Sequence, residues 1–205
     1  MPPRSLVLAS ASPARLALLR AAGLAPHVMA SGVEEDGVEG LTADDAARTL
    51  AERKADAVAA RLAAATGPVP LVVGCDSMLS IDGEVRGRPA SADQARDWWR
   101  TQRARSGILV TGHAVVDIAT GRRACAVART VVRFGAPSDD ELDAYIATGE
   151  PLAVAGACTI DGYGAPFVDG IDGDHGTVLG LSMPLLRRLL GELGVAITDL
   201  WVTRR

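Results

Sequence analysis

The chain has 205 residues, of which 48 % are apolar and 22 % charged, proportions typical of a soluble globular protein that exclude extended disorder. Its formal net charge of −4 gives no electrostatic reason to expect nucleic-acid binding, and no apolar run approaches the roughly 18 residues of a membrane span. Three cysteines without a CxxC pair argue against a disulfide framework or zinc knuckle. We therefore expect a cytoplasmic protein with neither nucleic-acid nor membrane partners.

In the first third of the chain, apolar runs alternate with segments that begin at helix-capping residues. Ser12 followed by Pro13 is typical of a helix N-terminus, and Thr42 with Asp45 resembles a capping box. The predicted elements are a strand at 6–9, a helix at 13–22, a strand at 27–30, an acidic loop at 31–36 and an Ala-rich helix from 43 to about Thr66.

The middle of the chain is richer in strand signals. A buried strand at 71–75 is expected to end at Asp76, and Asp82-Gly83 predicts a hairpin turn between strands 78–81 and 84–86. A helix at 92–103 is then followed by two longer strands at 108–118 and 124–134.

The last third begins with a helix that Ser138 caps, with Glu141 at the capping-box position. A Gly-rich stretch at 149–180, a helix at 184–193 and a strand at 196–202 complete the prediction. Alternating strands and helices, with hairpins among them, predict an α/β fold with a mixed central sheet and flanking helices, in a single domain over residues 1–205.

Several common catalytic motifs are absent from the sequence. It contains no Walker A loop, GxGxxG, GxSxG or HExxH motif and no Cys/His metal spacing. What remains is Ser10 and Ser12 beside Arg15 at a helix start, a combination suited to an anion, and Asp76 at a strand end. Taken alone, Ser10 and Ser12 beside Arg15 also fit a simple N-cap with a surface arginine. Asp76 alone also fits an aspartate in a turn.

Two further features are ambiguous by themselves. The acidic residues Glu34, Glu35 and Asp36 could supply hard oxygen ligands to Mg²⁺, although such triplets are usually solvated loops. Lys54 is the only lysine among 21 basic residues, but a lysine in the middle of a helix is solvated by default. His113 is expected to be a satisfied core residue rather than a ligand.

The order of these features along the chain is more specific than any one of them. The blocks are Leu8-Ala9-Ser10-Ala11-Ser12-Pro13-Ala14-Arg15, Val33-Glu34-Glu35, Leu50-Ala51-Glu52-Arg53-Lys54-Ala55, Val73-Gly74-Cys75-Asp76-Ser77, Asp82 to Pro89, Gly149-Glu150-Pro151, Ile160-Asp161-Gly162 and Val178 to Ser182. With this set, from about residue 6 to residue 190, the sequence resembles the Maf family of nucleoside triphosphate pyrophosphatases.

The resemblance implies a dimeric Maf- or ITPase-like protein with two lobes around a cleft, which hydrolyses nucleoside triphosphates to monophosphate and pyrophosphate with a divalent metal, Mg²⁺ or Mn²⁺. It implies nucleotide-pool cleansing or cell-division control as the role. Carried over by position, Asp76 is the general base and shares the metal with Glu35, and Lys54 contacts the triphosphate. The resemblance also implies a substrate site that includes Ser10, Ser12, Arg15 and Arg88.

Departures from the family pattern bear on specificity. Ala14, Ser77 and Asp161 stand where members that prefer dTTP and UTP have Arg, Thr and Gln, so the preferred base is open. Two alternatives also remain: a nucleotide-binding regulator with little or no turnover, which Ala153-Val154 in place of an Asp-Lys pair keeps in view, and a hydrolase that removes deaminated purine nucleotides.

Overall fold

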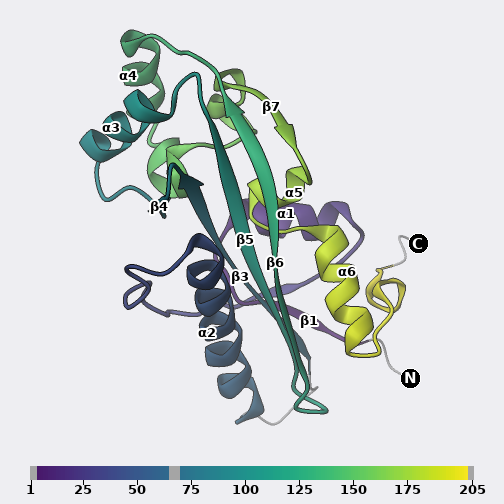
Figure 1. The fold of residues 1–205 in the computed structure, drawn as a ribbon. Helices are drawn as coiled ribbons and strands as arrows, with labels where there is room; N and C mark the ends of the chain where they lie inside the picture. The colour runs from purple at the N-terminus through teal and green to yellow at the C-terminus, as the bar shows by residue number, and fades with distance from the viewer. Residues whose placement is uncertain (1–3, 65–69, 203–205) are drawn as a thin grey trace. The chain divides into compact units, whose positions relative to one another are not determined.

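The computed structural model describes residues 4–64 and 70–202, and within them the chain forms two compact units. Of the described residues, unit 1 comprises 4–64, 70–76, 111–128 and 180–202, and unit 2 comprises 77–110 and 129–179. The seven-stranded sheet has the order β2-β1-β3-β5-β6-β7, with β4 paired to β3 (Figure 1). Since β1 pairs in parallel with β2 and β3 whereas β4 and β7 pair antiparallel, the predicted mixed α/β fold is confirmed.

Unit 1 carries helices on both faces of its strands. The apolar residues of β3 alternate between two clusters, because successive side chains of a strand point to opposite faces: Leu71 and Val73 pack with the leucines of α1 and α6, and Val72 packs with the alanines of α2. The elements with residues in this unit are β1 (Leu6–Leu8), α1 (Pro13–Ala21), β2 (His27–Val28), α2 (Ala43–Ala63), β3 (Leu71–Ile81), β5 (Ser106–Asp117), β6 (Arg123–Phe134), α6 (Met183–Glu192) and a 3₁₀ turn, η4 (Ile197–Leu200).

Unit 2 has an aromatic core around Trp99. The Trp99 ring meets Phe134, Tyr145 and Phe167 edge-on at centroid distances of 5.7, 6.0 and 6.1 Å, and its indole N–H donates to the Ala157 carbonyl at 2.8 Å. Its own elements are β4 (Glu84–Arg86), α3 (Ala92–Gln102), α4 (Asp139–Ala147), the 3₁₀ turns η1 (Glu150–Ala153), η2 (Ala155–Ala157) and η3 (Gly162–Phe167), β7 (Val168–Asp172) and α5 (His175–Leu179).

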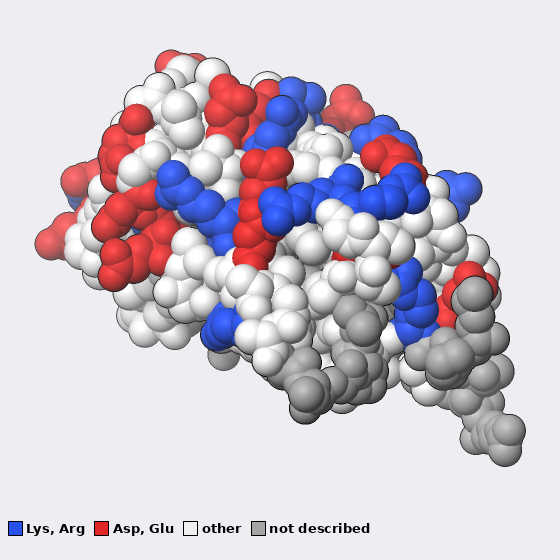
Figure 2. All heavy atoms as spheres, turned by 90° about the horizontal axis from the view of Figure 1, so that it is seen from below, with Lys and Arg blue, Asp and Glu red and all other residues white. Residues whose placement is uncertain are grey.

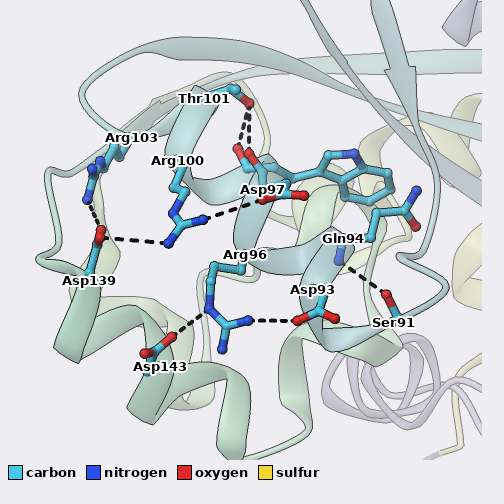
Figure 3. Close-up of polar contacts among 11 residues, drawn as sticks. Ser91, Asp93, Gln94, Arg96, Asp97, Arg100, Thr101, Arg103, Asp139 and Asp143 are labelled. Atoms are coloured by element: carbon cyan, nitrogen blue, oxygen red, sulfur yellow. Dashed lines mark hydrogen bonds and ion pairs between the residues drawn. The ribbon is translucent and has the colours of Figure 1, made fainter.

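Ion pairs on the surface of unit 2 connect α3 to α4 (Figure 3). Arg96 donates to Asp143 at 2.7 Å and to Asp93 at 2.9 Å, and Arg103 donates to Asp139 at 2.7 Å. These pairs are solvated, so each adds little to stability. On the face drawn in Figure 2, basic and acidic side chains are likewise interspersed, so no single sign of charge dominates that face.

Most predicted elements are confirmed, and the differences lie where pairing is long-range. β3 does not end at Asp76 but continues to Ile81, the segment predicted as a final strand at 196–202 contains the 3₁₀ turn η4 instead, and the Gly-rich stretch contains β7 and α5. The helix expected to reach about Thr66 ends at Ala63, and Thr66 lies outside the described residues. Within residues 4–64 and 70–202, no helix is long and apolar enough to cross a membrane.

Candidate functional site

The candidate site begins with the close approach of α2 to the sheet in unit 1. A Cβ on Gly74 would overlap the Ala51 carbonyl and lie 2.7 Å from the Ala55 nitrogen, and a Cβ on Gly112 would lie 2.8 Å from the Arg48 nitrogen. Glycine at these two strand positions therefore lets the α2 backbone rest directly on the sheet.

This approach decides the environment of Lys54. Ala47, Ala51, Ala55 and Val58 form the buried stripe of α2, and Lys54 falls beside it, with only 8 % of its surface exposed. Its place in a helix predicts a solvated side chain, and the structure shows this expectation to be wrong. A buried ammonium requires anionic partners.

Those partners are two carboxylates that were singled out from the sequence. The Lys54 ammonium donates to Asp76, at close range, and to Glu35 at 2.9 Å. Asp76 is 5 % exposed and lies on the α2 face of β3, two residues after Gly74, whereas Glu35 reaches the ammonium from the acidic loop and is half-buried. A single cation therefore bridges two carboxylates from different segments.

The electrostatics of Asp76 reflect this environment. Burial raises the pKa of the Asp76 carboxyl above its ordinary value, while the charges of Lys54 and Arg15 and the Lys54 hydrogen bond draw it back down. The neighbouring Cys75 points to the opposite face, into the α1/α6 core, where burial raises its thiol pKa to about 12. Cys75 is thus a neutral, buried side chain, as its sequence context predicts.

The acidic loop is held against α2 by two arginines as well as by Lys54. Arg53 donates to the Asp36 carbonyl at 2.8 Å, and Arg61 donates to the Ala30 and Ser31 carbonyls at 2.8 and 2.9 Å. These two residues were not identified from the sequence. The available signal was their spacing of eight residues, which places both on one face of a helix.

A second cluster forms at the start of α1. Ser12 is the N-cap of that helix, and its hydroxyl accepts from the Arg15 backbone N–H at 3.4 Å. The Ser10 hydroxyl accepts from the Ser12 N–H at 3.2 Å and from the Arg15 guanidinium at 3.0 Å. The other side of the guanidinium donates from Nε to the Gly180 carbonyl at 2.7 Å. The predicted loop of two hydroxyls and an arginine is thus assembled around one fixed cation.

The remaining predicted residues fall outside these two clusters. Ala14 lies in the first turn of α1, half-buried, and Ser77 follows Asp76 in β3. Arg88 and Asp161 belong to unit 2, where both are exposed and where the Asp161 carboxylate accepts from the Thr159 hydroxyl. Their roles in binding a substrate stay predictions.

The donor set at Lys54 bears on metal binding. Within residues 4–64 and 70–202, no group of three or more His, Cys, Asp or Glu side chains is arranged to hold a metal ion. Glu35 and Asp76 nevertheless already share one cation, the Lys54 ammonium, and carboxylate pairs are the protein ligands that Mg²⁺ commonly takes beside phosphates and water.

The fold and these two clusters define an α/β protein whose unit 1 is suited to a phosphate-bearing ligand. Comparison with known sequences agrees: the sequence profile of the Maf-like proteins matches residues 5–193, and the chain belongs to that family.

Three similar proteins are each named "Nucleoside triphosphate pyrophosphatase". The Streptomyces coelicolor protein is 58 % identical over 98 % of this chain and 96 % of its own length, and the Streptomyces avermitilis protein is 56 % identical over 99 % and 97 %. The Rhodococcus erythropolis protein is 50 % identical over 97 % of both chains.

Proposed function

We propose that this protein hydrolyses nucleoside triphosphates to nucleoside monophosphate and pyrophosphate. The observation that carries the proposal is the buried Lys54 ammonium between Asp76 and Glu35, with the anchored Arg15 close enough to influence the Asp76 carboxylate. The names and near-full-length similarity of the relatives support the same activity.

In the proposed reaction, Asp76 takes a proton from a water molecule, and the oxygen of that water attacks the α-phosphorus of the nucleotide. The bond from that phosphorus to the α,β-bridging oxygen breaks, and its electron pair leaves with pyrophosphate. Burial favours this role, because a raised pKa makes the carboxylate a stronger base. Lys54 and Arg15 bind the negatively charged phosphates and stabilise charge that moves toward the leaving group.

We further propose that Glu35 and Asp76 hold a divalent cation, Mg²⁺ or Mn²⁺. Two carboxylates of different segments, already bridged by a cation, would suit a hard divalent ion, which prefers oxygen ligands. When bound, such an ion supplies charge neutralisation at the phosphates and a lower pKa for bound water.

The test is product analysis with a panel of common and modified nucleoside triphosphates in Mg²⁺ or Mn²⁺. We expect monophosphate and pyrophosphate in equal amounts, with kcat reduced by about 10²- to 10⁴-fold in Asp76→Asn. Diphosphate and phosphate as products would contradict attack at the α-phosphorus. Nucleotide binding without turnover across the panel would favour the regulator instead.

The metal is tested separately with Glu35→Gln, which keeps the size of the side chain and removes its charge. We expect the Mg²⁺ concentration for half-maximal rate to rise, with kcat largely recovered at saturation, because affinity for a hard cation follows ligand charge. Glu34→Gln, in the same loop but exposed, is the matched control and leaves the Mg²⁺ dependence unchanged. An equal shift in both variants would count against a specific role for Glu35.

A further inference from the structure

His113 is a buried polar residue in unit 1 for which the proposed reaction has no use. It lies in β5 and is fully buried. Alternation along the strand places it on the face of Val115, toward the α1/α6 core, while its neighbour Gly112 faces α2. A buried imidazole among leucines is stable only where its nitrogens are hydrogen-bonded.

The hydrogen bonds at its two ring nitrogens define its chemical state. Nδ1 lies 3.0 Å from the Thr111 carbonyl oxygen, and Nε2 lies 2.8 Å from the backbone nitrogen of Ser182. A carbonyl only accepts and a backbone N–H only donates, so Nδ1 carries the proton and Nε2 presents a lone pair. The imidazole is therefore neutral and acts as an acceptor for Ser182.

Ser182 fixes a short segment that reaches the arginine cluster. Its hydroxyl caps α6 by accepting from the Leu185 N–H at 3.2 Å, and Leu181 before it is fully buried. Gly180, two residues before Ser182, has φ +99°, and its carbonyl accepts from the Arg15 Nε at 2.7 Å. A Cβ on Gly180 would lie 2.9 Å from that Nε, so the backbone meets the guanidinium directly.

These contacts form one continuous path from β5 to the helix start. The imidazole of His113 holds Ser182, the segment from Ser182 to Gly180 presents a carbonyl, and that carbonyl with the Ser10 hydroxyl holds both sides of the Arg15 guanidinium. When the Nε of an arginine is fixed in this way, the orientation of its remaining N–H groups is fixed as well. Small errors in that orientation weaken phosphate binding and lower the reaction rate.

We propose that His113 is a positioning residue that sets the orientation of Arg15 through the Gly180–Ser182 segment. The inference rests on the proposed function, in which Arg15 binds the triphosphate. His113 touches no substrate; it fixes the carbonyl against which Arg15 is oriented.

Three variants separate this role from simple packing. His113→Leu keeps bulk but removes the acceptor for Ser182, whereas His113→Gln restores an acceptor near the position of Nε2. Asp117→Asn is the matched control, because Asp117 is a buried polar residue on the same strand and in the same unit that pairs with Arg4 instead. All three are compared with wild type for thermal stability, kcat and KM.

We expect His113→Leu to lower kcat/KM by about tenfold, mainly through a higher KM, and His113→Gln to recover most of the loss. Asp117→Asn is expected to lower stability without changing KM. A double-mutant cycle with Arg15→Ala adds the stringent test: in that background, His113→Leu has no further effect on kcat/KM, because its target is gone. Equal effects in both backgrounds, or full kcat/KM in His113→Leu, would overturn the proposal.

An NMR measurement tests the orientation of Arg15 independently of enzymatic activity. In the two-dimensional NMR spectrum of guanidinium groups, the Arg15 Nε–H signal, assigned by its loss in Arg15→Lys, is expected to be shifted and protected from exchange by the Gly180 carbonyl. We expect that protection to be lost in His113→Leu and kept in His113→Gln. If only the proposed function is wrong, the wild-type protein shows no turnover, but protection of the Arg15 Nε–H is still lost in His113→Leu and kept in His113→Gln. Protection that is unchanged in His113→Leu would refute the positioning role.

Discussion

Gly74 of β3 lies so close to Ala51 of α2 that a methyl group on the glycine would overlap the Ala51 carbonyl. Three residues further along α2, the same close packing sets Lys54 between Asp76 and Glu35. The absence of a Cβ at Gly74 thus lets α2 come close enough to the sheet to place Lys54 beside Asp76. The packing of α2 on β3 and the electrostatics of the site are therefore linked through this one contact.

The first prediction follows from that contact. Gly74→Ala is expected to destabilise the protein by ~1–3 kcal/mol through overpacking, and to lower kcat/KM because α2 must move outward and take Lys54 with it. Urea unfolding and steady-state kinetics measure the two effects. Gly191→Ala, in α6 with open space around its Cβ, is the matched control and is expected to be neutral or stabilising by up to ~1 kcal/mol.

A second prediction concerns the buried ion pair. Lys54→Met leaves the Asp76 carboxylate without its main partner, and breaking such a pair typically costs ~3–5 kcal/mol at neutral pH. Loss of Lys54 raises the pKa of Asp76 further, so the folded state binds more protons than the unfolded state. Stability of the variant should therefore fall as pH rises from 4 to 7, more steeply than in wild type.

Urea unfolding at several pH values in the presence of EDTA checks this slope. Lys54→Met combined with Asp76→Asn serves as the control, because it removes the carboxylate that titrates. A parallel pH dependence in Lys54→Met and the double variant would show that Asp76 is not the group responsible.

The two serines at the start of α1 are expected to respond differently. Ser10→Ala removes one of the acceptors of the Arg15 guanidinium, so KM should rise by about three- to tenfold, the size of one lost hydrogen bond of ~0.7–1.4 kcal/mol. Ser12→Ala removes the N-cap and should mainly lower the unfolding free energy, by ~1 kcal/mol. Steady-state kinetics and chemical unfolding are measured on both variants. Equal changes in KM and in unfolding free energy for Ser10→Ala and Ser12→Ala would contradict the separate roles of the two serines.

The fourth prediction concerns acid stability. Asp117 accepts two hydrogen bonds from Arg4 and one from the Ala119 N–H, and its pKa lies below the ordinary value, chiefly because of the Arg4 hydrogen bonds. The resulting stabilisation is complete above the unfolded pKa of about 3.9 and is lost as pH falls through the lower folded pKa.

Asp117→Asn should thus be less stable than wild type at neutral pH and approach it in strong acid. Thermal unfolding between pH 2 and 7 gives the comparison. Arg4→Gln removes the other partner and is expected to reproduce most of the neutral-pH loss; a constant difference between wild type and Asp117→Asn at every pH would exclude the assigned pKa shift as its source.

Local signals accounted for much of the fold. The helix starts at Ser12, Thr42 and Ser138 are all capped as their side chains predict, since a cap is a contact between residues three apart. The Asp82-Gly83 turn likewise has both residues at positive φ, 50° and 84°, as a two-residue hairpin requires. These features depend on chemistry within a few residues, so the sequence contains them directly.

Elements that depend on distant partners were predicted less well. β3 continues through Asp76 because its later part pairs with β4. β7 is a strand because β6 lies beside it, although it falls within the Gly-rich stretch at 149–180. The Leu24 and Trp201 segments form only an isolated bridge, so the expected last strand is instead a 3₁₀ turn followed by that bridge.

The sequence by itself determined which chemical groups are present and in what order: Ser10, Ser12 and Arg15 at a helix start, Glu35 in an acidic loop, and Asp76 on a buried strand. Only the tertiary structure decided that Lys54 is buried between the two carboxylates, that the Gly180 carbonyl accepts from Arg15, and that His113 accepts from Ser182. Burial and charge pairing arise between residues 19 to 165 positions apart, and their energy depends on separations in space that no local pattern encodes.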